Sequence, residues 1–429
     1  MNATNRIMER IKTALIVILL ISALLLGRST KLFNDFFSMI PLFGSVAELM
    51  RNGAGVGEAK AAALKEAARP LCIAITNAEG ERYGARYDTD ARNAVYDRTS
   101  SIMGEALGSA TAFTEVFEGE WQAALKNPGV YFEYITPVRL SILNGWLAAH
   151  MPIAPGDVTL RRVFIAFGEE KSRIYYQDCG SGLFFGADTA TSAEKAQELG
   201  IYAPNGAVFA YESNLGIAGD APYMLIMPGN EYAEVKAAYP GEAEALLDAA
   251  ILALGHSNEQ YTTFSDWNGV VRSVGTQFNI SMDTKGNMLY HRTDMPPPDP
   301  DNKPLSENEL IELARAVAEK TVGRNCGEAD VFFETLEARG ANSWAVVFKY
   351  YVFGGSVHLQ DDSPAARISV TEGIVTAIEL CYRSFSSTGT YAVLLPERQT
   401  LAAAGSEFML NYPETGAEAL QPVWIRRDI

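Results

Sequence analysis

Leu305–Gly323 has the sequence LSENELIELARAVAEKTVG, which carries both a start signal and a stop signal for an α-helix. Ser306 is suited to cap the first turn, and Glu309 stands three residues later, where its side chain can close a capping box. Gly323 suits the position just after the last turn. The apolar positions recur at helical spacing and predict one buried stripe, made by Leu310, Leu313, Ala314 and Val317.

The segments on both sides of this helix predict β-strands. Upstream, residues 274–282 and 288–291 flank the turn Asp283–Asn287 as a predicted hairpin, and the linker DMPPPDPDNKP (294–304) is too rich in proline for a helix or a central strand. Downstream, four apolar runs predict strands: 331–339, 343–355, 366–370 and 374–385. In the second run, alternate apolar residues from Trp344 to Val352 predict a half-buried strand. One helix packed across such an antiparallel sheet buries both apolar faces, so we expect an α+β fold.

The rest of the chain divides into further predicted regions. Residues 69–190 predict an N-terminal α+β domain, with strands at 71–76 and 130–135, a turn at Pro137, and helices near 93–107 and 121–126. Residues 191–258 contain shorter patterns and form a predicted middle α+β domain, and residues 259–429 form a C-terminal domain. Because about 400 residues exceed one compact core, we expect two or three domains of antiparallel sheet packed against helices.

Ile11–Gly27, with the sequence IKTALIVILLISALLLG, predicts a transmembrane helix. No charged residue stands between Lys12 and Arg28, and about 17 residues span about 25 Å, near the short end of what crosses a hydrocarbon layer. The two basic residues can reach the opposite interfaces. The alternative is a cleaved secretory signal, but the small-x-small cleavage motif is missing, which favours an uncleaved anchor.

The charges around this helix predict its orientation. The segment before the apolar run carries Arg6, Arg10 and Lys12 against one acid, Glu9, a bias that favours a cytoplasmic N-terminus with residues 1–10 as a short tail. Residues 28–68 are expected to form a juxtamembrane segment and a linker helix. We therefore predict a single-pass protein of the cell membrane, with the bulk of the chain extracytoplasmic.

The chain has 429 residues and a formal net charge of −17, which argues against binding to nucleic acid and to anionic headgroups beyond the anchor. Its hydrophobic content of 48% excludes wholesale disorder. The four cysteines, Cys72, Cys179, Cys326 and Cys381, are widely spaced and contain no CxxC pair. An extracytoplasmic location permits disulfides, and four cysteines allow three pairings. The apolar surroundings of Cys72 and Cys381 favour free buried thiols, and Cys326–Cys381 is the first pair to test.

No group of residues in the sequence predicts catalysis. The four histidines (His150, His256, His291 and His358) stand at no metal-ligand spacing, and HExxH is absent. GSGLFFG (180–186) lacks the lysine of a phosphate loop and predicts a strand turn. Asp299 and Asp301 lie in the proline linker, where solvation explains them better than calcium, since EF-hand spacing is missing. We therefore predict no catalytic, cofactor-binding or metal-binding residues, no cofactor, and a protein that is not an enzyme.

The order of parts in the last region resembles a PepSY-type module: a hairpin with an Asp-x-x-Gly turn, a capped helix, then antiparallel strands with a Glu-Gly turn. The tail IVTAIELCYRSF…AVLLPERQTLAAA…PVWI resembles the C-terminal part of the YycH/YycI family of Gram-positive bacteria. GVYFEYITPVRL, followed by RRVFIAF, resembles the first domain of the YycH branch. The single N-terminal anchor and the three-region length agree with that branch.

This resemblance implies a non-enzymatic accessory regulator that acts outside the cell. Its implied partners are the membrane sensor histidine kinase of the WalK–WalR cell-wall two-component system and a second protein of YycH/YycI type. The resemblance transfers no functional residue, because the family has no catalytic motif to match.

Two other functional classes stay open. One is an extracytoplasmic binding module for a peptide added along a sheet edge, for an envelope protease or for a cell-wall component. The other is a cell-envelope hydrolase whose carboxylate pair or metal site is assembled from distant residues. The residues alone do not decide the partner, the direction of regulation or the oligomeric state.

Overall fold

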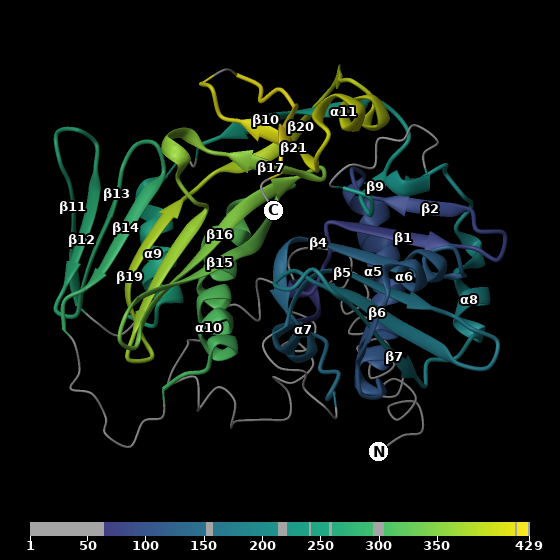
Figure 1. Cartoon of the computed structure of the whole chain (residues 1–429). Helices are drawn as coiled ribbons and strands as arrows, with labels where there is room; N and C mark the ends of the chain where they lie inside the picture. The colour runs from purple at the N-terminus through teal and green to yellow at the C-terminus, as the bar shows by residue number, and fades with distance from the viewer. Residues whose placement is uncertain are drawn as a thin grey trace, which may run out of the picture.

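Two large sheets, each packed against helices, dominate the described part of the chain in the computed structural model (Figure 1). The structure describes residues 64–151, 158–212, 221–239, 242–256, 260–294, 304–416 and 418–427. The predicted membrane helix at 11–27 and residues 295–303 of the proline linker lie outside these ranges. No helix within the described ranges is long and apolar enough to cross a membrane.

The first sheet has seven strands in the order β2-β1-β4-β5-β6-β7-β3, and all neighbours are antiparallel. We call this sheet and its helices the N-terminal lobe. Its strands are β1 (Cys72–Thr76), β2 (Arg82–Ala85), β3 (Thr114–Val116), β4 (Gly129–Arg139), β5 (Thr159–Ala166), β6 (Ser172–Asp178) and β7 (Phe184–Thr189). Its helices are α5 (Thr89–Gly108), α6 (Glu118–Ala124), α7 (Leu140–Trp146) and the short α8 (Glu194–Glu198).

Both faces of this first sheet are covered. Successive residues of β1 point to opposite faces: Ile73 packs in the cluster that contains Val95 of α5, whereas Ala74 packs in the cluster that contains Trp121 of α6. The central strands can therefore be apolar throughout, which explains why β1 is buried along its whole length.

The second sheet has eleven strands and, with α9 and α10, forms the C-terminal lobe. Its main path runs β11-β12-β13-β14-β19-β18-β16-β17-β21-β22, and β15 pairs with β16. The strands are β11 (Tyr261–Ser265), β12 (Val271–Gly275), β13 (Phe278–Met282), β14 (Asn287–Arg292), β15 (Asp330–Gly340), β16 (Ser343–Val352), β17 (Gly355–His358), β18 (Ala366–Thr371), β19 (Ile374–Cys381), β21 (Phe408–Pro413) and β22 (Val423–Arg426). Its pairs are antiparallel except β17–β21.

Helix α10 (Glu307–Lys320) begins as the sequence predicts. The Glu309 amide donates to the Ser306 hydroxyl at 3.4 Å, and the Ser306 amide donates to the Glu309 carboxylate at 2.8 Å, so both bonds of the capping box are present. Its buried residues are Leu310, Ile311, Ala314, Val317 and Ala318. A second helix, α9 (Ala243–Ala253), packs beside it against β12 and β13.

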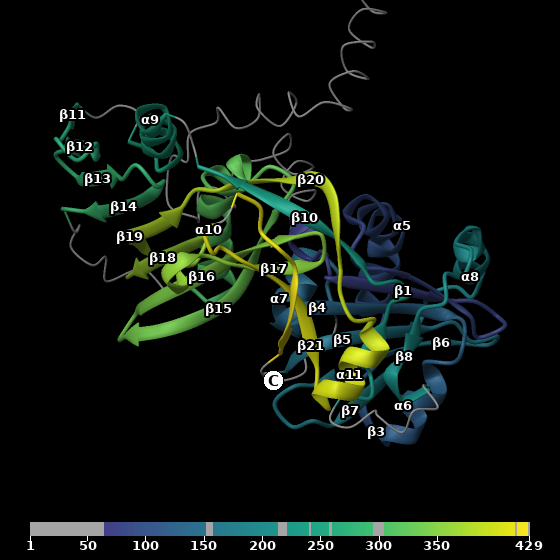
Figure 2. The ribbon, with the colours of Figure 1, turned by 90° about the horizontal axis from the view of Figure 1, so that it is seen from above.

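A two-stranded ribbon of β10 (Glu231–Ala238) and β20 (Ser384–Val393) runs between the lobes, as Figure 2 shows. After β20 the chain enters α11 (Glu397–Ala404), which lies over the N-terminal lobe. The residues predicted as a middle domain contribute to both lobes: β8 (Val208–Phe209) and β9 (Leu225–Ile226) pack on the first sheet, and α9 packs on the second. The domain boundaries drawn from the sequence stay predictions.

Antiparallel sheets packed against helices confirm the predicted α+β class, but three local predictions are wrong. Pro137 does not end a strand, because β4 continues through it to Arg139 with a register shift between Glu133 and Val138. Residues 274–282 form parts of two strands, because the chain reverses between Gly275 and Phe278. Strand β16 is buried on both faces rather than half-buried.

Candidate functional site

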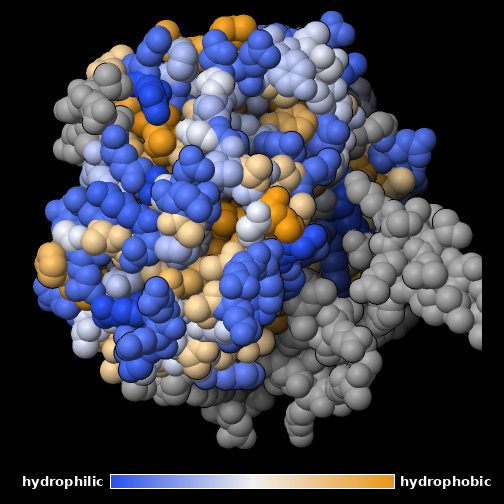
Figure 3. All heavy atoms as spheres, turned by 90° about the vertical axis from the view of Figure 1, so that its right-hand side faces the viewer, coloured by the Kyte–Doolittle hydropathy of each residue, from blue (hydrophilic) through white to orange (hydrophobic). Residues whose placement is uncertain are grey.

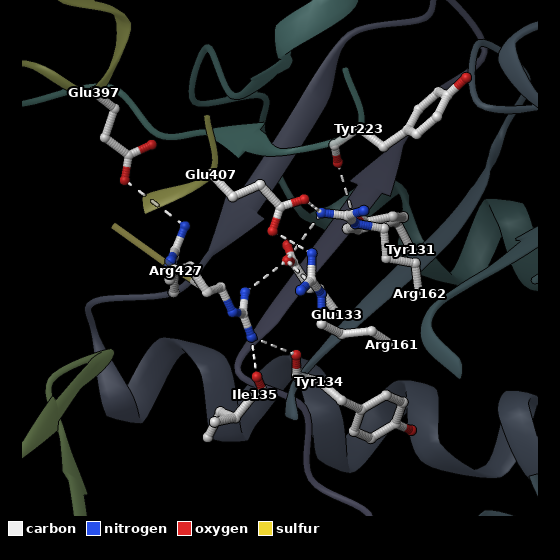
Figure 4. A network of polar contacts seen from close by, with 11 residues as sticks. Tyr131, Glu133, Tyr134, Ile135, Arg161, Arg162, Tyr223, Glu397, Glu407 and Arg427 are labelled. Atoms are coloured by element: carbon white, nitrogen blue, oxygen red, sulfur yellow. Dashed lines mark hydrogen bonds and ion pairs between the residues drawn. The ribbon is translucent and has the colours of Figure 1, made fainter. Parts of the chain in front are cut away.

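Seven buried ionisable side chains meet where the two lobes join, and Figure 4 shows their contacts. We call them the interlobe charge cluster, and no side chain among them is more than 8% exposed: Arg86, Glu133, Arg161, Arg162, Glu397, Glu407 and Arg427. The first four follow β2 or lie on β4 and β5 of the N-terminal lobe. The other three lie at the start of α11, directly before β21 and directly after β22, so the C-terminal segment supplies them.

Glu407 lies between two neighbouring arginines of β5. The Arg161 guanidinium donates to one of its carboxylate oxygens and the Arg162 guanidinium to the other. Burial opposes ionisation of Glu407, but Arg162 and Arg161 overcome this effect and lower its pKa from 4.5 to about 2. Glu407 is therefore charged in the folded protein at any physiological pH.

Glu133 connects the C-terminal end of the chain to the same cluster. Arg427 Nη1 donates to Glu133 Oε1 at 3.2 Å, and Arg427 Nη2 donates to the carbonyls of Tyr134, at 3.1 Å, and Ile135. Burial and the nearby Arg161 guanidinium lower the pKa of Arg427 to about 10. Arg161 and Arg162 lie 3.8 and 3.6 Å from Glu133, so this carboxylate and Glu407 share the same two guanidinium groups.

Glu397, the first residue of α11, forms the third carboxylate of the cluster and has no exposed side-chain surface. It accepts hydrogen bonds from the Tyr87 hydroxyl and, at 2.7 Å, from the Met227 amide. Arg86 Nη1 is 3.9 Å away. Burial raises the pKa of Glu397, and the Arg86 charge opposes this rise.

The composition of the cluster indicates a structural role. Four arginines and three glutamates leave one net positive charge, and every carboxylate has at least one guanidinium group within 4 Å. Burying such a network costs desolvation energy. Removal of one partner leaves a buried charge uncompensated and destabilises the fold by about 3–5 kcal/mol. Each side chain of the cluster therefore contributes strongly to the attachment of the C-terminal segment to the N-terminal sheet.

A second set of contacts joins the lobes on the helical side. Arg92 of α5 donates to Asp330 of β15 at 2.6 Å, and its burial makes this a desolvated ion pair. Arg139 lies 2.6 Å from Glu307, the first residue of α10. The Trp146 indole nitrogen also donates to the Glu312 carboxylate of α10. These ionic contacts orient the lobes through specific pairs rather than through apolar burial alone.

The N-terminal lobe also carries an open, polar cavity of about 730 Å³ on its surface. It is lined by the end of α5, the turn between β5 and β6, and residues 188–194. Asp188 lies 3.2 Å from Arg173 and 3.4 Å from Lys171, so its charge is neutralised locally. The face of the molecule on the right-hand side of Figure 1 is mostly hydrophilic, with hydrophobic residues in small separate patches (Figure 3). This cavity lacks the convergent polar groups around an apolar floor that are typical of small-molecule sites.

The histidines and cysteines of the sequence do not form a reactive centre in the part of the chain that the structure describes. Within the described ranges no three His, Cys, Asp or Glu side chains come together as a metal site. His256 is buried, with Nε2 2.9 Å from the Tyr290 hydroxyl. All four cysteines are free in the structure, Cys179 exposed and the other three buried, which agrees with the prediction of buried thiols at Cys72 and Cys381. Asp299 and Asp301 lie outside the described residues.

The interlobe charge cluster was not predicted, although the sequence contains two signals for it. Arg161 and Arg162 interrupt the apolar run TLRRVFIAF, and Glu133 interrupts VYFEYI. Charged residues in strands that are otherwise apolar on both sides are rarely buried unless they are paired. The partners, Glu407 and Arg427, stand more than 240 residues away along the chain, so only the fold reveals the pairing.

Comparisons with known proteins agree with this architecture. No family model matches the chain, and no curated protein matches it at a significant level. Among solved structures, YycH from Bacillus subtilis matches with a TM-score of 0.53 and 12% sequence identity, covering 84% of this chain and 94% of that chain. At such low identity the likeness establishes the fold alone. The chain therefore has a YycH-like fold, and the PepSY-type module stays a prediction.

Proposed function

We propose that the chain is a membrane-anchored extracytoplasmic regulator that modulates a WalK-type sensor histidine kinase by protein contact. The observation that carries this proposal is the YycH-like fold, which extends over both lobes rather than over one module. The resemblance of the tail and of the first strands to the YycH/YycI family supports the same role. In this proposal Ile11–Gly27 is the anchor, and both lobes lie outside the cell.

The chemistry of the lobe junction supports contact rather than catalysis. The buried carboxylates of the interlobe charge cluster each face guanidinium groups, so their charges are engaged in holding the two lobes together. A partner that binds one lobe can change the position of the other only if the junction transmits force. Paired buried charges provide such a junction, because they have few alternative arrangements of similar energy.

A binding module for an extended peptide is the second candidate. One observation favours it: the uncharged stretch Ser386–Tyr391 of β20 is exposed. This alternative does not exclude the first, since a kinase or a second YycH/YycI-type protein can supply such a peptide. The two candidate functions differ in one respect: only the regulator requires binding to a sensor kinase in the membrane.

Crosslinking in native membranes tests the proposal. The full chain is tagged at its C-terminus, crosslinked in living cells, purified under denaturing conditions and analysed by mass spectrometry. We expect a sensor histidine kinase and a second YycH/YycI-type protein among the captured proteins. A control chain with 11–27 replaced by an unrelated membrane span shows whether the anchor contributes to contact. Capture of other membrane proteins without any histidine kinase would contradict the proposal.

A further inference from the structure

Residues 64–71 enter the fold at the junction between the two lobes. We call them the connecting segment, because the predicted anchor lies upstream of them in the chain. Residues 64–67 are helical, and Leu71 directly precedes β1 of the N-terminal lobe. The covalent path from the predicted anchor to both lobes therefore runs through this segment.

Glu133 of β4 binds the connecting segment and the C-terminal segment at the same time. Its backbone carbonyl accepts a hydrogen bond from the Leu71 amide at 2.8 Å. Its carboxylate accepts a hydrogen bond from Arg427 Nη1 at 3.2 Å. A shift of either segment therefore moves the residue to which the other segment is bound.

The side chain of Leu71 is buried at the interface of the two lobes. It has no exposed surface and belongs to a small apolar cluster with Ile135 of β4, Tyr351 of β16 and Met409 of β21. The first of these strands belongs to the N-terminal lobe, and the other two belong to the C-terminal lobe. Displacement of Leu71 would leave a cavity in this cluster, which costs stability at the interface itself.

Asp330 of β15 forms a second shared contact. Its Oδ1 lies 3.5 Å from Arg69 Nη1 of the connecting segment, and its Oδ2 accepts a hydrogen bond from Arg92 Nη2 of α5 at 2.6 Å. The Arg69 side chain is 16% exposed and the Arg92 side chain 2%, so solvent screens these pairs only partly. One carboxylate of the C-terminal lobe thus holds both the N-terminal lobe and the connecting segment.

The connecting segment is also held along its length. The Tyr96 hydroxyl of α5 donates to the Lys65 carbonyl at 2.5 Å, and Lys65 Nζ donates to the Asp97 carbonyl at 3.4 Å. Ala68 has no exposed surface, and the ring of Pro70 restricts the backbone just before Leu71. A displacement at residue 64 is therefore transmitted to the lobe interface instead of being absorbed by slack chain.

We propose that the connecting segment couples the membrane side of the chain to the arrangement of the two lobes. Docking of the segment and attachment of the lobes stabilise each other, because both use Glu133, Asp330 and the cluster around Leu71. Such coupling acts in both directions. A displacement of the anchor that undocks the segment loosens the lobe junction, and a partner that separates the lobes releases the segment.

This inference deepens the proposed function, on which it rests for the anchor at 11–27 and for the use of the coupling in regulation. In that role the segment transmits a change between a partner in the membrane and the lobes outside it. The coupling itself is a property of the folded chain, so it is measured without any partner.

Hydrogen exchange of the purified full chain in detergent micelles tests the coupling in one direction. Glu407→Gln weakens the interlobe charge cluster, whose members all lie outside the connecting segment. We expect exchange at the amides of Ala68, Arg69 and Leu71 to accelerate about fivefold or more. The matched control is Glu414→Gln, which breaks a buried pair within the C-terminal lobe and should leave these amides unchanged.

Arg69→Gln tests the other direction, because it removes the ion pair between the connecting segment and Asp330. We expect exchange in β22 and at the Arg427 amide, which donates to the Glu407 carbonyl at 2.9 Å, to accelerate about threefold or more. Leu71→Val shortens the buried side chain without removing a charge and should act in the same direction.

Arg173→Gln in β6 is the matched control for this direction. It loses the ion pairs with Glu120 and Asp188, at 2.6 and 3.2 Å, which lie within the N-terminal lobe. Exchange at 423–427 should stay unchanged in this variant. Circular dichroism shows whether each variant folds, and the two directions use different variants, so either one decides the question if a variant of the other fails to fold.

Three results would overturn the inference. They are unchanged exchange at 68–71 in Glu407→Gln, an equal acceleration there in Glu414→Gln, and unchanged exchange at 423–427 in both Arg69→Gln and Leu71→Val. Kinase capture from membranes is measured separately. A chain that shows the coupling but captures no kinase contradicts only the proposed function, and a chain that captures the kinase without the coupling contradicts only this inference.

Discussion

Substitution of Glu407 by glutamine tests whether the interlobe charge cluster holds the lobes together. Glutamine keeps the size of the side chain but removes its charge between Arg161 and Arg162. The pKa of Glu407 falls from 4.5 to about 2 on folding, and each tenfold change in proton affinity corresponds to about 1.4 kcal/mol. The ionised carboxylate therefore contributes about 3 kcal/mol to the free energy of unfolding at neutral pH, in the range expected for a broken buried pair.

The pH dependence of this loss has a definite sign. Because folding lowers the pKa of Glu407, its contribution is fully present above the unfolded value of 4.5 and is lost as the pH falls towards 2. The stability difference between the native chain and Glu407→Gln should therefore be about 3 kcal/mol near pH 7 and about half of that near pH 3. Urea unfolding followed by circular dichroism at a series of pH values measures this difference.

A matched control separates the lobe junction from buried ion pairs in general. Glu414 pairs with Arg383 at 2.8 Å, also buried, but this pair lies within the C-terminal lobe and its loop rather than between lobes. Glu414→Gln should also destabilise the chain, yet only Glu407→Gln should accelerate hydrogen exchange in β5 and β22 together. A stability difference below about 1 kcal/mol, or one that does not change between pH 7 and pH 3, would refute the reasoning about the cluster.

Three further predictions concern other parts of the fold. Ser306→Ala should destabilise α10 by about 1 kcal/mol in urea unfolding, whereas Ser306→Asp should retain the cap; equal losses would exclude capping as the cause. Gly354→Ala should cost more than about 2 kcal/mol, because its φ is +74° and a Cβ atom there would lie 2.8 Å from the Arg86 carbonyl oxygen of the other lobe. Gly389→Ala is the control: its φ is +80° but the new Cβ would meet no atom within 4 Å, so it should cost only about 1 kcal/mol. Equal costs for the two variants would show that the contact between the lobes at Gly354 adds nothing to the backbone strain. A thiol reagent should modify Cys179 quickly in the folded chain and the three buried cysteines only after unfolding, so fewer than four thiols in the unfolded chain would indicate a disulfide.

The parts of the fold that the sequence predicts are those specified by nearby residues. Helix α10 is one case, since its capping box and most of its buried stripe lie within Leu305–Val317, although the helix ends at Lys320 with Thr321 as its C-cap and Gly323 begins a short 3-10 turn instead of ending the helix. The turn at Glu372–Gly373 is another, since both of its residues have positive φ in the structure. In such segments the local preferences and the tertiary contacts agree.

The parts that the sequence does not predict depend on distant partners. Strand β20 has a polar start and no clear alternation, and its pairing with β10 joins residues about 150 positions apart. Glu407 is one of many glutamates in the sequence, and only the return of the C-terminal segment to β5 distinguishes it from them. Likewise, β16 shows the alternation of a half-buried strand, but the packing of the two lobes buries its second face as well.

Reconstitution of the sensor kinase tests the central claim most directly. The WalK-type kinase of the source organism is inserted in lipid vesicles with and without the full chain, and its autophosphorylation rate is measured with ATP. The proposed regulatory role predicts a reproducible change in this rate when the chain is present, and a smaller change with Glu407→Gln, whose lobe junction is weakened. An identical rate with and without the chain, in vesicles where crosslinking shows that the two proteins are in contact, would contradict the account.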